Sequence, residues 1–125
     1  MKVISTTKAP AAIGPYSQGL ETAGMVFVSG QIPVDPQTGN IPETIEEQTA
    51  QSLSNLENIL GANGMTMADV VKTSVFLADL GDFAAMNEVY ASRFQEPYPA
   101  RSCVQVAAIP KGCRVEIECI AVKQR

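Results

Sequence analysis

Histidine and tryptophan are absent from this sequence of 125 residues. Without histidine the chain cannot build a Ser-His-Asp or Cys-His catalytic site or an HExxH zinc site, and it lacks the commonest metal ligand. Any acid-base chemistry must therefore fall to glutamate, aspartate, tyrosine, lysine or cysteine side chains, or to bound water. Because tryptophan is missing, stacking on nucleic-acid bases would depend on three tyrosines and four phenylalanines.

Basic residues, paired cysteines and long apolar runs are also scarce. The formal net charge is −4, with 13 acidic against 9 basic residues, so no nucleic-acid partner is expected. The three cysteines, Cys103, Cys113 and Cys119, are odd in number and form no CxxC pair, which indicates free thiols in a reducing compartment, the cytoplasm. The sequence shows no pattern of a secretory signal, and no run approaches the length of a membrane span.

The residues that are present predict one domain over 1–125, with 46 % hydrophobic content. Apolar, β-branched runs predict strands at 2–6, 25–30, 69–80, 100–109 and 113–122. Thr44 and Asp82 are typical first residues of two helices, and the first helix has an apolar stripe of Ile45, Leu53, Leu56 and Leu60. The order β-β-α-β-α-β-β predicts an α+β domain whose mixed sheet has both helices on one face.

The second face of that sheet needs a partner. In the strand expected at 69–80, Val70 and Phe76 lie opposite Val71, Val75 and Leu77, so both faces are apolar. Two helices can cover only one of them. Self-association is the simplest way to cover the other.

Charged residues interrupt the last two expected strands. Their short link, Pro110-Lys111-Gly112, predicts an antiparallel pair. Alternation places Arg101 beside Cys103 on one face and Glu116 on a polar face of the next strand, and these faces could meet in a small cleft. Arginine binds a carboxylate through two parallel hydrogen bonds, and a glutamate can position or activate water. The alternative is a structural Arg101–Glu116 ion pair with no ligand, since ion pairs outnumber active sites.

Other candidates carry weaker signals. Tyr16 in its Gly-Pro loop either caps a pocket or is a partly buried aromatic residue. Ser29-Gly30 ends a strand, where glycine either permits close approach of a ligand or forms an ordinary turn. Asn87 alone would be interpreted as a surface residue, and Cys103, with no histidine to activate it, as a small buried thiol.

Several stretches together resemble the Rid (YjgF-type) family of enamine/imine deaminases, RidA-like: PARSCVQVAAIPKGCRVEIECIAV, APAAIGPYSQG, VFVSGQIPVDPQTG and DFAAMNEVYASRF. The resemblance spans nearly the whole chain in the same order. It implies a chorismate-mutase-like fold in a homotrimer, with sheets around a central barrel and active clefts between subunits. It also implies a 2-iminobutanoate/2-iminopropanoate deaminase. Such an enzyme hydrolyses reactive enamines and imines, such as 2-aminoacrylate, to 2-keto acids and ammonia without a cofactor or metal.

The same resemblance assigns roles to matched positions. Arg101 matches the arginine that binds the substrate carboxylate, and Glu116 matches the glutamate that activates water. The remaining matches are Tyr16 at the cleft and the substrate-contacting positions Ser29, Gly30, Asn87 and Cys103. Cys113, Cys119 and Arg114 fall outside the motif, and Arg114 is expected to face solvent or an interface.

Two other functions fit part of this pattern. A module that binds carboxylate metabolites, or a chaperone-like protein, would use Arg101 equally well and would need no Glu116. An RNA-directed activity has been suggested for some relatives, but the acidic balance of the chain and its lack of histidine weigh against it.

Overall fold

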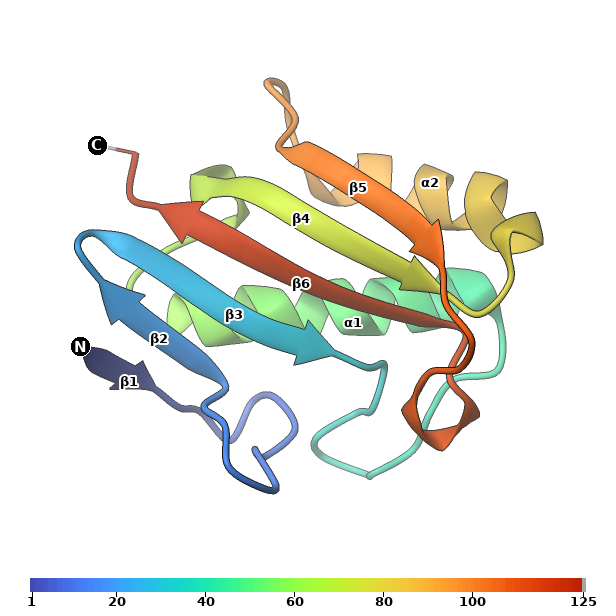
Figure 1. The fold of residues 1–125 in the computed structure, drawn as a ribbon, viewed down its shortest axis with the longest axis horizontal. Coiled ribbons are helices and arrows are strands. Elements are labelled where there is room, and N and C mark those ends of the chain that lie inside the picture. Colours follow the sequence, from blue (N-terminus) through green and yellow to red (C-terminus); the bar gives the residue numbers. More distant parts are fainter. Residues whose placement is uncertain (125) are drawn as a thin grey trace.

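A six-stranded mixed sheet with two helices behind it makes up the computed structural model, which describes residues 1–124 (Figure 1). The strands are β1 (Lys2–Ile4), β2 (Gly19–Thr22), β3 (Met25–Gln31), β4 (Val70–Leu77), β5 (Ala100–Gln105) and β6 (Val115–Val122). The helices are α1 (Ile45–Gly61) and α2 (Phe83–Arg93). Across the sheet the order is β1-β2-β3-β6-β4-β5, and only β4 and β5 run parallel. The predicted α+β class is confirmed.

Helix α1 begins where the sequence predicts. The Thr44 hydroxyl accepts a hydrogen bond from the Glu47 amide at 3.1 Å, and Glu46 and Glu47 lie at the positive end of the helix dipole. The predicted stripe is buried: Ile45, Leu53, Leu56 and Leu60. This face packs on the sheet and supplies much of the core.

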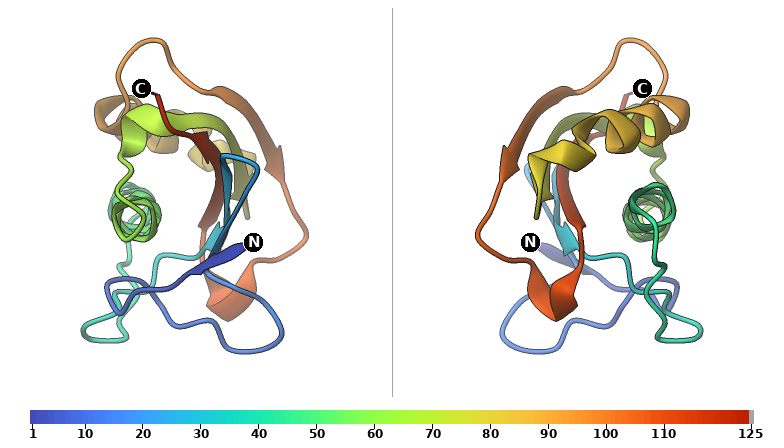
Figure 2. Two further views of the ribbon diagram at one scale, coloured as in Figure 1. Left: turned by 90° about the vertical axis from the view of Figure 1, so that its left-hand side faces the viewer. Right: turned by 90° about the vertical axis from the view of Figure 1, so that its right-hand side faces the viewer.

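Both helices cover the same face of the sheet, so the molecule has two layers (Figure 2). Alternate residues of β4 and β6 point toward the helices and are fully buried, namely Val75, Leu77, Val115 and Ile117. The opposite face, here called the open face, has no cover within residues 1–124. Its large apolar side chains remain partly exposed, among them Phe27 at 39 % and Val104 at 46 %. The predicted need for a partner on this face therefore remains a prediction.

The predicted hairpin of the last two strands is wrong. Strand β5 pairs in parallel with β4 at the edge of the sheet, while β6 lies between β3 and β4. Strand β5 ends at Gln105 and β6 begins at Val115, so residues 106–114 connect them. This link is long enough to cross from the edge of the sheet to its centre, and it includes the short turn Pro110–Gly112.

Strand β2 lies between the strands expected at 2–6 and 25–30 and was not predicted from the sequence. Its hairpin with β3 turns at Ala23 and Gly24, both with positive φ (52° and 77°), the geometry of a two-residue hairpin turn. In β4 a register shift between Val70 and Lys72 turns Val71 away from the buried residues, contrary to the expected alternation.

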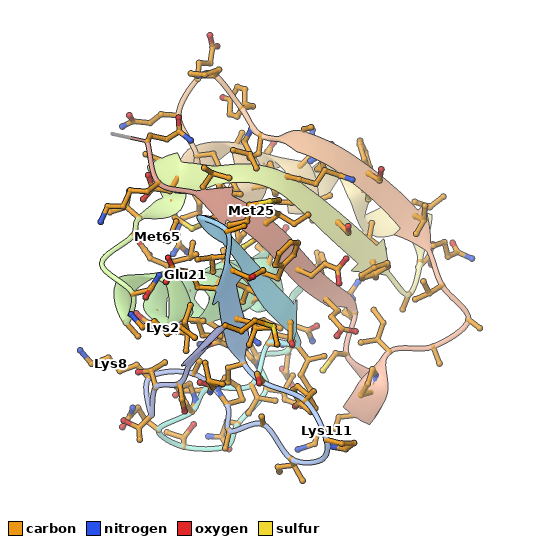
Figure 3. The ribbon with its side chains drawn as sticks, turned by 60° about the vertical axis from the view of Figure 1, so that its left-hand side comes forward. Lys2, Lys8, Glu21, Met25, Met65 and Lys111 are labelled. Atoms are coloured by element: carbon orange, nitrogen blue, oxygen red, sulfur yellow. The ribbon has the colours of Figure 1, made fainter. Side chains whose placement is uncertain are left out.

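Polar side chains connect the edge strands β1 and β2 to the segment that follows α1. Lys2, Glu21 and Met65 gather beside the end of α1 in Figure 3, where Lys2 donates to Asn63 at 2.7 Å and Asn63 donates to Glu21 at 3.1 Å. This network fixes the edge strands against the helix.

No helix within residues 1–124 combines the length and apolar character needed to cross a membrane.

Candidate active site

Arg101 lies on the helix-facing side of β5, directly over α2. Its backbone pairs with buried Thr73 of β4, which sets the direction of its side chain. Arg101 Nη1 donates to Asn87 Oδ1 at 2.6 Å. The guanidinium carbon lies 4.7 Å from the centre of the Tyr90 ring and 5.5 Å from that of Phe83. We call these four residues the Arg101 cluster.

No carboxylate neutralises Arg101 within residues 1–124. The ion pairs of this region join Arg93 to Glu57 and Arg114 to Asp82. Arg101 instead borders a cavity of about 440 Å³ together with Asn87, Tyr90, Ala91, Tyr98 and Pro99. An arginine held in place beside a cavity, without an acidic partner, is suited to binding an anion.

Glu116 lies on the open face of β6, where alternation also places Glu118. A side chain on Gly30 of β3 would collide with the Glu116 carboxylate, so the glycine leaves the space that the carboxylate occupies. Burial raises the pKa of Glu116, and the like charge of Glu118 raises it further. An ionised carboxylate with a raised pKa is a stronger proton acceptor than an ordinary glutamate.

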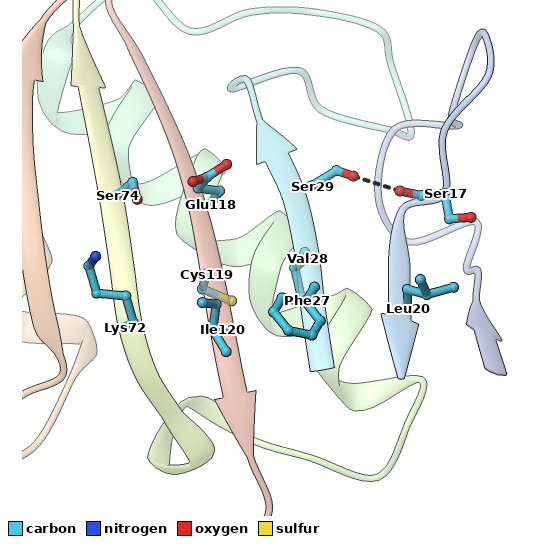
Figure 4. A pocket seen from close by; sticks show the side chains of 10 residues that line it. All are labelled: Ser17, Leu20, Phe27, Val28, Ser29, Lys72, Ser74, Glu118, Cys119 and Ile120. Atoms are coloured by element: carbon cyan, nitrogen blue, oxygen red, sulfur yellow. Dashed lines mark hydrogen bonds between the residues drawn. The ribbon is translucent and has the colours of Figure 1, made fainter. Parts of the chain in front are cut away.

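Ser29 and Tyr16 lie at the same side of the sheet as Gly30. Ser29 Oγ donates to the Ser17 carbonyl at 2.6 Å and lines a hollow on the open face that also contains Lys72 and Glu118 (Figure 4). The exposed Tyr16 and Gly30 border a second cavity of about 560 Å³. With Glu116 these residues form the second group, here called the Glu116 cluster: Tyr16, Ser29, Gly30, Glu116 and Glu118.

Arg101 and Glu116 of one chain do not meet, contrary to the sequence interpretation. Arg101 pairs with Thr73 and Glu116 with Phe76, on opposite sides of β4. They are thus about 10 Å apart along the strand and about 10 Å apart across it, and their side chains leave opposite faces of the sheet. The same geometry excludes a structural Arg101–Glu116 ion pair within one chain.

The cysteines are free thiols with little thiolate character. Cys103 is half-buried, and its burial raises the pKa of the thiol while Arg101 lowers it. Burial and Glu118 raise the pKa of Cys119 to about 12. Burial, followed by Glu116, raises the pKa of Cys113 as well. Cys103 is thus less buried than the sequence interpretation expected, and its neutral thiol is a weak nucleophile.

Arg114 has a partner that the sequence did not reveal. It forms a two-bond pair with Asp82, from Nη2 to Oδ1 at 2.8 Å and from Nε to Oδ2 at 3.1 Å. Asp82 precedes α2 as predicted, but its side chain makes no capping hydrogen bond there. The pair ties the start of α2 to the start of β6.

The sequence interpretation missed Phe83, Tyr90 and Tyr98 as neighbours of Arg101. From the sequence, Phe83 and Tyr90 share one apolar face of the second helix with Met86 and Phe94, a pattern that does not by itself indicate a neighbour of Arg101. Positions 83 and 90 lie on one helical face together with Asn87, and this spacing could have identified the rings as neighbours of one site.

Within residues 1–124 no group of three or more Cys, Asp or Glu side chains is arranged to hold a metal ion.

Comparison with known proteins defines the class. The family model described as Endoribonuclease L-PSP matches residues 6–123, nearly the whole chain. The chain therefore belongs to the L-PSP family, which includes the YjgF/Rid proteins, as the resemblance predicted.

Several members of this family to which the chain is similar have names that describe an activity. The chain is 53 % identical over 125 residues to the reactive intermediate deaminase TdcF of Escherichia coli K12, covering 98 % of this chain and 97 % of that protein. It is 53 % identical over 123 residues to 2-iminobutanoate/2-iminopropanoate deaminase of Mus musculus, covering 98 % and 91 %. The crystal structure of E. coli TdcF with bound serine has a TM-score of 0.95 at 52 % identity, covering 99 % of this chain and 100 % of that one.

Proposed function

We propose that this protein is an imine deaminase, a hydrolase acting on C–N bonds. Its substrates are 2-imino acids such as 2-iminobutanoate and 2-iminopropanoate, the latter a tautomer of 2-aminoacrylate, and its products are 2-keto acids and ammonia. The observation that carries the proposal is Arg101, a fixed cation beside a cavity with no acidic partner in residues 1–124. The activities named for relatives about half identical over almost their full length support it.

In the proposed mechanism Arg101 binds the substrate carboxylate through two N–H groups, and Asn87 orients the guanidinium. Glu116 takes a proton from a water molecule, whose oxygen adds to the C=N carbon. The nitrogen takes one proton back from Glu116 and a second from the new hydroxyl group as the C–N bond breaks, so the imine and one water become the keto acid and ammonia. Every group in these steps is an amino-acid side chain or water, and the proposal needs no cofactor or metal.

Two copies of the chain are needed for this chemistry, since Arg101 and Glu116 leave opposite faces of one sheet. We propose a homotrimer in which the partly exposed apolar side chains of the open face pack together. Arg101, Asn87 and Cys103 of one subunit then face Glu116, Tyr16, Ser29 and Gly30 of its neighbour. Tyr16 closes the cleft from its exposed loop.

The proposed compartment is the cytoplasm, because all three cysteines remain free thiols. An RNA-directed activity is not proposed, despite the name of the family model, because the net charge of −4 provides no basic stripe for phosphates.

The test measures keto acid and ammonia released from freshly generated 2-aminoacrylate. We expect Arg101→Ala to abolish turnover and to weaken binding of 2-ketobutyrate, while Glu116→Gln cuts turnover and keeps that binding. Arg93→Ala, which removes an arginine bound to α1, is the matched control and should keep its activity per folded molecule. Wild-type rates in Arg101→Ala would overturn the proposal. Binding of the keto acid without any turnover in the unmodified protein would favour a carboxylate-binding module instead.

A further inference from the structure

Three residues on one face of α2 contact the Arg101 side chain. We infer that Phe83 and Tyr90 are positioning residues for Arg101: their two rings and the Asn87 amide fix the guanidinium in the orientation that receives a carboxylate. The inference rests on the proposed function, because it concerns the same anion-binding group.

The contacts come from one face of one helix. Positions 83, 87 and 90 lie on the same side of α2, and Arg101 reaches all three from β5. A guanidinium within about 6 Å of a ring centre is attracted by the electrons of the ring face. Both rings are within this range, at 4.7 Å for Tyr90 and 5.5 Å for Phe83.

Tyr90 is itself anchored. Its hydroxyl shares a 2.7 Å hydrogen bond with Thr73 Oγ1, and its exposed fraction is 4 %. The centre of its ring lies 4.6 Å from that of Phe94, with the two rings tilted by 38°. Thr73 is also the residue of β4 that pairs with Arg101. The same position of β4 therefore fixes both the backbone of the arginine and the ring below its side chain.

Such anchoring affects binding more than chemistry. A free arginine must give up its rotamer freedom when it binds a ligand, whereas an arginine already fixed by its own fold has given it up on folding. Removing a ring should therefore weaken binding of the substrate carboxylate and leave the later attack of water unchanged. This difference separates a positioning role from a general structural one.

The experiment removes each ring in turn. In Phe83→Leu, at a side chain that is 39 % exposed and so tolerant of change, we expect KM for the imino acid and the dissociation constant of 2-ketobutyrate to rise together, about threefold to tenfold. The value of kcat should stay within about twofold of wild type. Folded Tyr90→Leu should show the same rise in KM and in the dissociation constant. Phe83→Tyr and Tyr90→Phe keep a ring, so they should retain most of the wild-type affinity for 2-ketobutyrate.

Leu56→Val is the control, because it trims a fully buried side chain of α1, whereas the side-chain partners of Arg101 described above all lie on α2. It should lower stability and leave KM unchanged. Unchanged KM and binding in Phe83→Leu, while Arg101→Ala is inactive, would overturn the inference and leave the proposed function standing. A fall in kcat at constant KM would overturn it as well, whereas full binding by Arg101→Ala would overturn the proposed function itself.

Discussion

At the scale of single residues, Glu116 has the most unusual surroundings among the candidate catalytic groups. It is half-buried, Gly30 leaves room beside its carboxylate, and Glu118 projects from the same face two residues further along β6. Burial and then Glu118 raise its pKa. A proposed base with a raised pKa holds its proton to a higher pH than an ordinary glutamate, so its protonation state should limit the reaction on the acid side.

Glu118→Gln tests this coupling. Glu116 must be ionised to take a proton from water, so kcat falls as the pH drops through its pKa. Removing the like charge of Glu118 lowers that pKa, and we expect the acid limb of the pH–rate profile to move to lower pH. The profile of kcat between pH 4 and 9 measures the midpoint, with Glu88→Gln, an exposed residue of α2, as control. A limb that stays in place or moves to higher pH contradicts the assignment of Glu116 as the base.

At the scale of elements, patterns of neighbouring residues predicted the helices correctly. They did not predict which strands pair in the sheet, because strand pairing joins residues far apart in the sequence. The cap at Thr44 and the stripe of α1 depend on residues within a few positions of one another, so the sequence shows them directly. The neighbours of β5 and β6 depend on where the chain crosses the sheet. Nothing in Pro110-Lys111-Gly112 reveals that residues 106–114 carry the chain from the edge to the centre.

The same limit applies to the candidate site. Residue type and the family resemblance pointed to Arg101 and Glu116, but alternation along each strand cannot say which faces of different strands coincide. The rings around Arg101 were visible as a helical stripe, yet a core stripe has the same spacing. Which strands pair with β5 and β6 decides both questions, and strand pairing is known only from the folded sheet.

The loop of residues 5–18, which carries Tyr16, is an element held by one buried side chain. The Gln18 amide accepts from Thr6 N at 2.7 Å and donates to the carbonyls of Thr6, Ala9 and Pro10 at 3.1, 3.4 and 2.7 Å. Gln18→Leu leaves these backbone groups unpaired, so we expect the free energy of unfolding to fall by about 1–3 kcal/mol. Chemical denaturation measures it, and the exposed Gln37→Leu should change it little. Equal effects of the two variants would show that the Gln18 bonds do not hold the loop.

At the scale of the whole molecule, one sheet separates the two halves of the proposed site. The helix-facing side carries the Arg101 cluster, and the open face and its rim carry the Glu116 cluster. Within one chain no bending of a packed sheet brings them together, because the core between the helices and the sheet would be lost. A second copy that places its open-face side against the first can bring its Glu116 to the Arg101 of that first copy. The same contact also covers the exposed apolar side chains of the open face.

This arrangement predicts complementation between inactive variants. Arg101→Ala and Glu116→Gln should each be nearly inactive alone. When they are unfolded together and refolded as a mixture, sites that draw intact Arg101 and intact Glu116 from different copies should recover about a quarter of wild-type activity. As a control, wild type mixed equally with the double variant should also give about a quarter if the site spans two copies, but about half if each chain holds a complete site. Absence of recovery, with mixed assemblies confirmed by native mass spectrometry, would place both residues in a single chain and contradict the shared site.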